Sequence, residues 1–158
     1  MDSLPQTGVV EWIGLRPERN APIEVVNSVE AKSGRGLVGD HYSKQDGKGQ
    51  VTLIQAEHLD AIGSMLGGVT VKPADVRRNI VVRGINLLAL KDKQFRVGDA
   101  IFEYTGLCHP CSRMESTLGP GGYNALRGHG GITTHVVQSG VIQSGDPVSV
   151  LPRPNEAN

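Results

Sequence analysis

The chain has 158 residues, and its 16 Lys and Arg are balanced by 16 Asp and Glu. A balanced charge argues against a general nucleic-acid binder or a membrane-surface protein, because both need a basic excess. No apolar run approaches the roughly 20 residues of a membrane-spanning helix, and the first residues lack the features of a signal peptide. We therefore expect a cytoplasmic protein with reduced thiols.

Hydrophobic alternation and turn residues divide the chain into short elements. Strands are predicted at residues 9–13, 23–29, 51–54, 79–83, 95–104 (a pair turning at Gly98-Asp99), 132–137 and 148–151. Leu59, Ile62 and Leu66 recur at helical spacing, which predicts an amphipathic helix beginning near residue 55 and ending at Gly67-Gly68. Residues 123–127 fit a single helical turn.

The element pattern favours one β-rich fold. The 21 glycines and 9 prolines suit many tight corners between strands. One convincing helix among so many strands argues against alternating βαβ units. The sequence therefore predicts an all-β fold, a strongly bent, mainly antiparallel β-barrel with one or two short helices. We expect a single domain over residues 1–158, with a core at 9–150 and a loose tail at 152–158.

Cys108 and Cys111 are the two cysteines of the chain and form one Cys-x-x-Cys motif just after a predicted strand. A thiolate is a strong nucleophile and a soft metal ligand. Two buried cysteines that only fill space would not need this spacing. The motif itself leaves redox exchange, metal ligation and sulfur carriage open.

The surrounding sequence weighs against two of these uses. A thioredoxin-like site places the motif at the start of a helix in a βαβ layout, and the layout here is β-rich. A zinc site would add His129 and His135, yet the stretch between the pairs carries a Gly-Pro-Gly-Gly run in place of a finger's helix. A structural domain stabilised by zinc stays open as an alternative function.

Three groups of residues suit an anionic cofactor, because arginines grip phosphate bidentately and glycines let backbone N–H groups approach it. They are Arg77-Arg78-Asn79 before a strand, Arg113 after the cysteines, and the turn Arg127-Gly128-His129-Gly130-Gly131. No acidic residue lies between Val76 and Asp92. We therefore expect Arg77, Arg78 and Arg113 to converge near Cys111, and Arg78→Ala to weaken cofactor binding without unfolding the barrel.

At these residues the chain resembles the MOSC domain family, named for the C-terminal domain of molybdenum cofactor sulfurase. The stretches that carry the resemblance follow the family's order at residues 36–41, 51–57, 77–82, 95–100, 108–111, 127–131 and 142–146. The chain is similar to the short, stand-alone members. One departure from the family pattern is His129, which stands where an arginine is common.

The resemblance implies binding of the molybdenum cofactor (molybdopterin), with Cys111 as the residue that ligates molybdenum or carries sulfur. It implies reduction of a small N-hydroxylated substrate, with electrons from a separate redox partner protein. The alternative is a sulfur-carrier module that holds a persulfide on Cys111 and receives it from a partner such as a cysteine desulfurase. At the level of the whole family the resemblance also implies pyridoxal phosphate binding.

The expected site therefore has three parts. Cys111 is the catalytic residue, and Cys108 is a second candidate metal ligand. Asp40 and His41 lie in a long glycine-bearing loop, and we expect this loop near the barrel mouth that holds Cys111. The candidate cofactor ligands are Arg77, Arg78, Asn79, Arg113, Arg127, Gly128, His129, Gly130, Asp40 and His41. The sequence leaves the substrate, the electron donor, the oligomeric state and any Cys108–Cys111 disulfide open.

Overall fold

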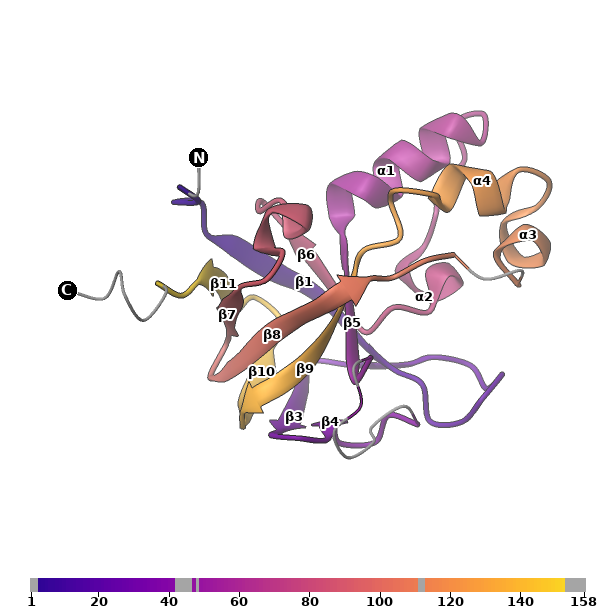
Figure 1. Cartoon of the computed structure of the whole chain (residues 1–158). Coiled ribbons are helices and arrows are strands. Elements are labelled where there is room, and N and C mark those ends of the chain that lie inside the picture. The colour runs from indigo at the N-terminus through magenta and orange to yellow at the C-terminus, as the bar shows by residue number, and fades with distance from the viewer. Residues whose placement is uncertain (1–2, 42–46, 48, 111–112, 153–158) are drawn as a thin grey trace.

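Seven strands of the computed structural model close into a barrel (Figure 1). The structure describes residues 3–41, 47, 49–110 and 113–152. The strand order is β11-β7-β8-β9-β5-β6-β1, and pairing of β1 with β11 closes the ring. The strands are β1 (Gly8–Leu15), β5 (Val51–Gln55), β6 (Ile80–Arg83), β7 (Gln94–Val97), β8 (Ala100–Leu107), β9 (Ile132–Gln138) and β11 (Pro147–Val150). The predicted barrel is confirmed.

The pairing is mainly antiparallel, as predicted, with one exception among the described strands. β5 and β6 run parallel, with Leu53 opposite Ile80. Parallel neighbours need a crossover, and here it carries α1 (Ala56–Met65) and α2 (Pro73–Val76). The fold therefore contains one β-α-β connection inside an otherwise antiparallel barrel, which the argument against alternating units did not anticipate.

The hairpin between β7 and β8 turns where the sequence places it. Val97 is opposite Ala100, so Gly98 and Asp99 form a two-residue turn. Gly98 has a φ of 57°, and a Cβ at this position would overlap the Asp146 carboxylate. Glycine is the residue that accepts this conformation without strain.

A second, smaller sheet lies beside the barrel and corrects one predicted strand. The predicted strand at residues 23–29 divides into β2 (Glu24–Val26), which extends the barrel sheet beyond β1, and β3 (Ser28–Lys32). β3 is the centre of a three-stranded sheet between β10 (Gly140–Gln143) and β4 (Gly36–Leu37). Neither β4 nor β10 was predicted.

The helices gather at one end of the barrel (Figure 1). Beside α1 and α2 lie α3 (Arg113–Leu118) and α4 (Gly122–Leu126), and a 3-10 turn, η1 (Leu87–Leu90), follows β6. α1 ends at Met65, just before the predicted stop at Gly67-Gly68, and α4 overlaps the helical turn predicted at residues 123–127. No helix among the described residues is long and apolar enough to cross a membrane.

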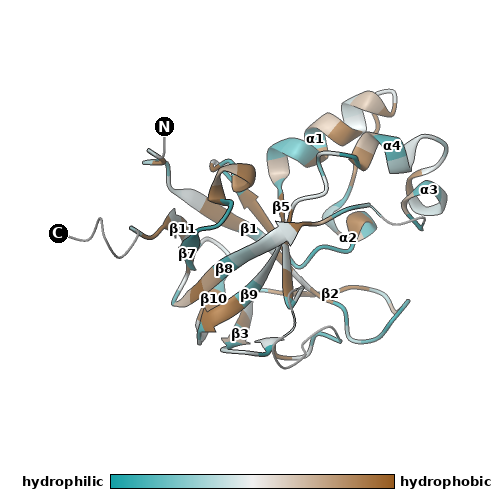
Figure 2. Ribbon diagram, viewed as in Figure 1, coloured by the Kyte–Doolittle hydropathy of each residue, from teal (hydrophilic) through white to brown (hydrophobic). Residues whose placement is uncertain are grey.

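Two apolar cores follow from this arrangement. One fills the barrel interior, where Phe95 and Phe102 meet edge to face with ring centroids 6.0 Å apart. The other lies between the barrel wall and the helices and includes Leu59, Ile62 and Met114. In Figure 2 the start of α1 and β7 are hydrophilic, which fits their exposed faces. Of the predicted loose tail, residues 153–158 lie outside the described residues, and the single-domain boundary stays a prediction.

Candidate functional site

A pocket rich in arginine lies between the end of β1, the turn from α2 into β6, and the start of α3. We call it the arginine pocket. It has a volume of about 250 Å³. Its lining is Arg16, Arg19, Val76, Arg77, Arg78, Arg113 and Met114. The structure thus brings the predicted Arg77, Arg78 and Arg113 together and adds two arginines that the sequence analysis missed.

The charge around this pocket is incompletely neutralised. Arg16 forms an ion pair with Asp40. Among the described residues, Arg19, Arg78 and Arg113 have no carboxylate partner. Arg19 and Arg113 are exposed, whereas Arg78 is 6% exposed. Guanidinium groups held close together repel one another and favour an anion between them.

Asp40 holds Arg16, one of the residues that line the arginine pocket. Its side chain is fully buried and accepts two hydrogen bonds from the Arg16 guanidinium, from Nε at 3.1 Å and from Nη2 at 2.9 Å. The backbone N–H of Arg16 donates a third bond at 2.8 Å. Asp40 therefore fixes the end of β1 and the Arg16 side chain.

Asn79 completes this buried network. Its Oδ1 accepts from Arg16 Nη2 at 2.8 Å and from the Thr52 backbone N–H at 3.1 Å. Its Nδ2 donates to Asp40 Oδ1 at 3.1 Å and to the Gly14 carbonyl at 3.0 Å. Because Asn79 is fully buried, it stabilises the base of the arginine pocket and does not line it. Thr52 was not among the predicted site residues.

Asn79 links Asp40 to the part of the chain that carries Arg78. Asn79 bonds to Asp40 and is the chain neighbour of Arg78, which lines the pocket. His41 is exposed, and its backbone N–H donates to the Arg16 carbonyl at 2.6 Å. The expected closeness of Asp40 and His41 to Cys111 stays a prediction, because Cys111 lies outside the described residues.

Arg78 joins three backbone segments. Its Nε donates to the Gly130 carbonyl at 2.8 Å, its Nη1 to the Val76 carbonyl at 2.8 Å, and its Nη2 to the His109 carbonyl at 3.4 Å. These bonds make Arg78 part of the protein framework. The expectation that Arg78→Ala leaves the barrel undisturbed is therefore replaced, because the substitution would remove the donor from three carbonyls, two of them in buried hydrogen bonds.

Arg77 turns the chain from α2 into β6. It adopts a left-handed conformation with a φ of 55°, which is uncommon for a residue with a side chain. Its Nη1 donates to the Ala21 carbonyl at 2.6 Å. Local strain of this kind often marks a functional position, and here it directs the neighbouring Arg78 into the protein.

The described part of the cysteine motif continues from β8. We call residues 107–110 the cysteine segment. Cys108 is half-buried, and its backbone N–H donates to the Gly131 carbonyl at 2.9 Å. Among the described residues, Cys108, His129 and His135 do not form a group of three candidate metal ligands. Cys111 lies outside the described residues, so the zinc alternative stays untested. His135 instead contacts Glu103 at 3.3 Å.

The glycine-rich turn, residues 127–131, lies against the cysteine segment. A Cβ on Gly130 would overlap the Cys108 carbonyl, and one on Gly131 would overlap the Leu53 carbonyl. Arg127 and Gly128 are exposed, and neither they nor His129 line the arginine pocket. This turn therefore supports the cysteine segment by close backbone approach.

We expect Gly130→Ala to lower the free energy of unfolding by about 1–3 kcal/mol, because the added methyl group forces the two segments apart. Gly106→Ala, in β8, is the matched control, because the new Cβ there meets only Thr133 Oγ1, at 3.4 Å. This control should stay within about 0.5 kcal/mol of the native chain. Urea unfolding of both variants checks the prediction, and an equal loss in both would refute the close packing of the turn.

The His129 ring packs against the ring of His58 in α1. The ring centroids are 5.0 Å apart in an edge-to-face arrangement, and His129 Nδ1 lies 3.2 Å from the Ala125 carbonyl oxygen. Burial lowers the pKa of His58, and the charge of His129 lowers it further, against an opposing effect of Glu57. The sequence analysis did not single out His58, whose position in a helix carries no motif.

We expect His58 to make the protein less stable in mild acid. Because its pKa is lower in the folded than in the unfolded chain, the unfolded chain takes up the proton first as the pH falls below about 6.5. Denaturant unfolding at about pH 7.5 and about pH 5.5 should show a smaller loss on acidification for His58→Gln than for the native chain. His109→Gln, at an exposed position, is the control. An undiminished loss in His58→Gln would contradict this prediction.

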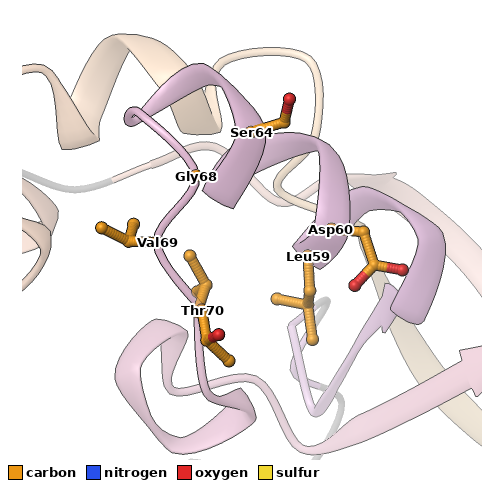
Figure 3. A pocket seen from close by; sticks show the side chains of 7 residues that line it. Leu59, Asp60, Ser64, Gly68, Val69 and Thr70 are labelled. Atoms are coloured by element: carbon orange, nitrogen blue, oxygen red, sulfur yellow. The ribbon is translucent and has the colours of Figure 1, made fainter.

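A second pocket of about 270 Å³ lies between α1 and residues 68–71 (Figure 3). Figure 3 shows Leu59 and Asp60 both extending from α1, with the Asp60 carboxylate lying farther than Leu59 from the segment that carries Thr70. It contains neither an arginine nor a cysteine. Its polar groups do not converge, so the arginine pocket is the candidate functional site.

Comparisons with known proteins agree with this architecture. A sequence model described as the MOSC domain matches residues 38–149. Among solved structures, YuaD from Bacillus subtilis is similar with a TM-score of 0.80 and 18% identity, covering 94% of this chain and 98% of that chain. YiiM from Geobacillus stearothermophilus gives a TM-score of 0.72 at 18% identity, covering 92% and 76%. YiiM from Escherichia coli gives 0.69 at 16% identity, covering 92% and 70%. No curated protein sequence matches the chain. Identities this low support the fold alone.

Proposed function

Because this chain belongs to the MOSC domain family, we propose that it binds the molybdenum cofactor and reduces small N-hydroxylated bases or amines with electrons from a separate donor protein. The observation that carries this proposal is the arginine pocket. It is joined to the cysteine segment by the bond from Arg78 to the His109 carbonyl.

The residues present suit the anionic end of this cofactor. The pocket of about 250 Å³ is smaller than the roughly 300–1,000 Å³ of sites that enclose a whole ligand. It can therefore take a phosphate group with part of the pterin. The exposed side chains of Arg19 and Arg113 would bind the phosphate. The buried Arg78 has two N–H groups that no described residue engages, and these would bind the phosphate as well.

Each protein group would have a distinct task. The Cys111 thiolate would be the soft ligand for molybdenum. The Asp40–Arg16–Asn79 network would keep the base of the pocket rigid. When bound, the cofactor would supply the two-electron chemistry that reduces an N–O bond, with the oxygen leaving as water after uptake of two protons. The electron donor would restore the two electrons.

We expect Arg113→Ala and Arg19→Ala each to weaken cofactor retention by about tenfold to a hundredfold, the loss of one charge-assisted phosphate contact. Both side chains are exposed, so stability should change little. The protein would be made in a host that synthesises the cofactor, and molybdenum and pterin would be measured per chain, together with reductase activity under a chemical reductant.

Arg83→Ala is the control for lost positive charge, because Arg83 lies outside the pocket and pairs with Glu11. It should retain the cofactor. A native chain that carries no molybdenum, but shows a labile mass increase of one sulfur atom on Cys111, would replace this proposal with the sulfur-carrier function.

A further inference from the structure

Arg78 contacts both segments that surround the candidate site. Its guanidinium donates hydrogen bonds to His109 in the cysteine segment and to Gly130 in the glycine-rich turn. A third bond goes to Val76, the last residue of α2. Arg78 also lines the arginine pocket. We propose that Arg78 is a positioning residue that couples occupancy of the arginine pocket to the position of the cysteine segment.

The geometry requires a guanidinium. Arginine has five N–H donors in a planar fork, and three of them are used by carbonyl oxygens in three different segments. Lysine would keep the charge, but one ammonium at the end of a flexible stem cannot reproduce this fork. The coupling therefore depends on the shape of the side chain and not on its charge alone.

The lengths of the three hydrogen bonds indicate which segment an anion in the pocket would affect. The bonds to Gly130 and Val76 are 2.8 Å long, whereas the bond to His109 is 3.4 Å. One N–H on Nη1 and one on Nη2 have no acceptor among the described residues. An anion on these two groups would fix the plane of the guanidinium. The Nη2 donor would then be held toward the His109 carbonyl, and the cysteine segment would become less mobile.

This inference rests on the proposed function only in taking the anion to be the cofactor's phosphate. Inorganic phosphate is the probe, so the test needs neither molybdenum nor turnover. Hydrogen exchange of the full chain would be followed by mass spectrometry with and without phosphate, at an ionic strength matched with sodium chloride. The cysteine segment and the glycine-rich turn share the bond from Cys108 N–H to the Gly131 carbonyl. We expect phosphate to slow exchange there by roughly two- to tenfold, the effect of about one hydrogen bond on local opening.

Arg78→Lys is the informative variant, because it keeps the charge and avoids the larger packing defect of Arg78→Ala. It should bind phosphate but lose the protection of the cysteine segment. Arg19→Ala is the control, because Arg19 lines the same pocket and makes no hydrogen bond to either segment among the described residues. It should need more phosphate but show full protection at saturation.

Two outcomes would overturn the inference. One is a native chain whose cysteine segment exchanges equally fast with and without phosphate. The other is an Arg78→Lys chain that keeps full protection. Molybdenum content, measured separately, decides the proposed function, so failure of one leaves the other standing.

Discussion

Cys111→Ser is expected to abolish molybdenum retention, while Cys108→Ser only reduces it. Serine offers a hard, protonated oxygen where the metal favours a soft thiolate, so the change removes the ligand and not only part of its affinity. Cys108 is half-buried and held by its backbone to Gly131, which suits a residue of the supporting framework. Molybdenum per chain, measured by elemental analysis on both variants made in the same host, checks the prediction.

The two cysteine variants serve as each other's control, because each removes one sulfur from the same motif. Thermal unfolding should show that both remain folded. Equal and complete loss of molybdenum in the two variants would contradict the assignment to Cys111 and indicate a site that uses both thiols.

Asp40→Ala is expected to have the largest effect on stability. It would remove the carboxylate that pairs with the buried Arg16 guanidinium and accepts a hydrogen bond from the Asn79 amide. Removing one partner of a buried ion pair costs about 3–5 kcal/mol, since the remaining charge stays desolvated. Urea unfolding of the native chain and the variant gives the difference in free energy.

Glu18→Ala is the matched control, because Glu18 is an exposed carboxylate close to Arg16 in the sequence. It should change stability by no more than about 0.5 kcal/mol. A similarly small effect for Asp40→Ala would show that Arg16 finds solvent or another partner. The network would then not be the rigid base of the arginine pocket.

The barrel could be predicted because its strands carry local signals. β1, β6 and β9 alternate or run apolar between turn residues, and Gly98-Asp99 fixes a hairpin. β4 and β10 escaped prediction, because two and four residues flanked by glycine and serine look like turns until β3 supplies their hydrogen bonds. α2 escaped for a similar reason, since four residues starting at a proline have little helical periodicity.

The site was predictable in its composition and less so in its geometry. Arg77, Arg78 and Arg113 line one pocket, while their closeness to Cys111 stays a prediction. The sequence does not show that Arg77 turns left-handed and directs Arg78 inward. Arg16 and Arg19 belong to no motif, and Glu18 between them makes the stretch resemble an ordinary charged loop. Only the folded chain brings Arg16, which follows β1, next to Asp40 and Asn79.

The central claim is that the arginine pocket holds the anionic end of the molybdenum cofactor beside the cysteine motif. A crystal structure of the chain purified with the cofactor tests it most directly. We predict the cofactor's phosphate within hydrogen-bond distance of Arg113 and Arg78, and molybdenum bonded to the sulfur of Cys111. A phosphate located elsewhere, such as in the pocket beside α1, with the arginine pocket filled only by water, would contradict the account.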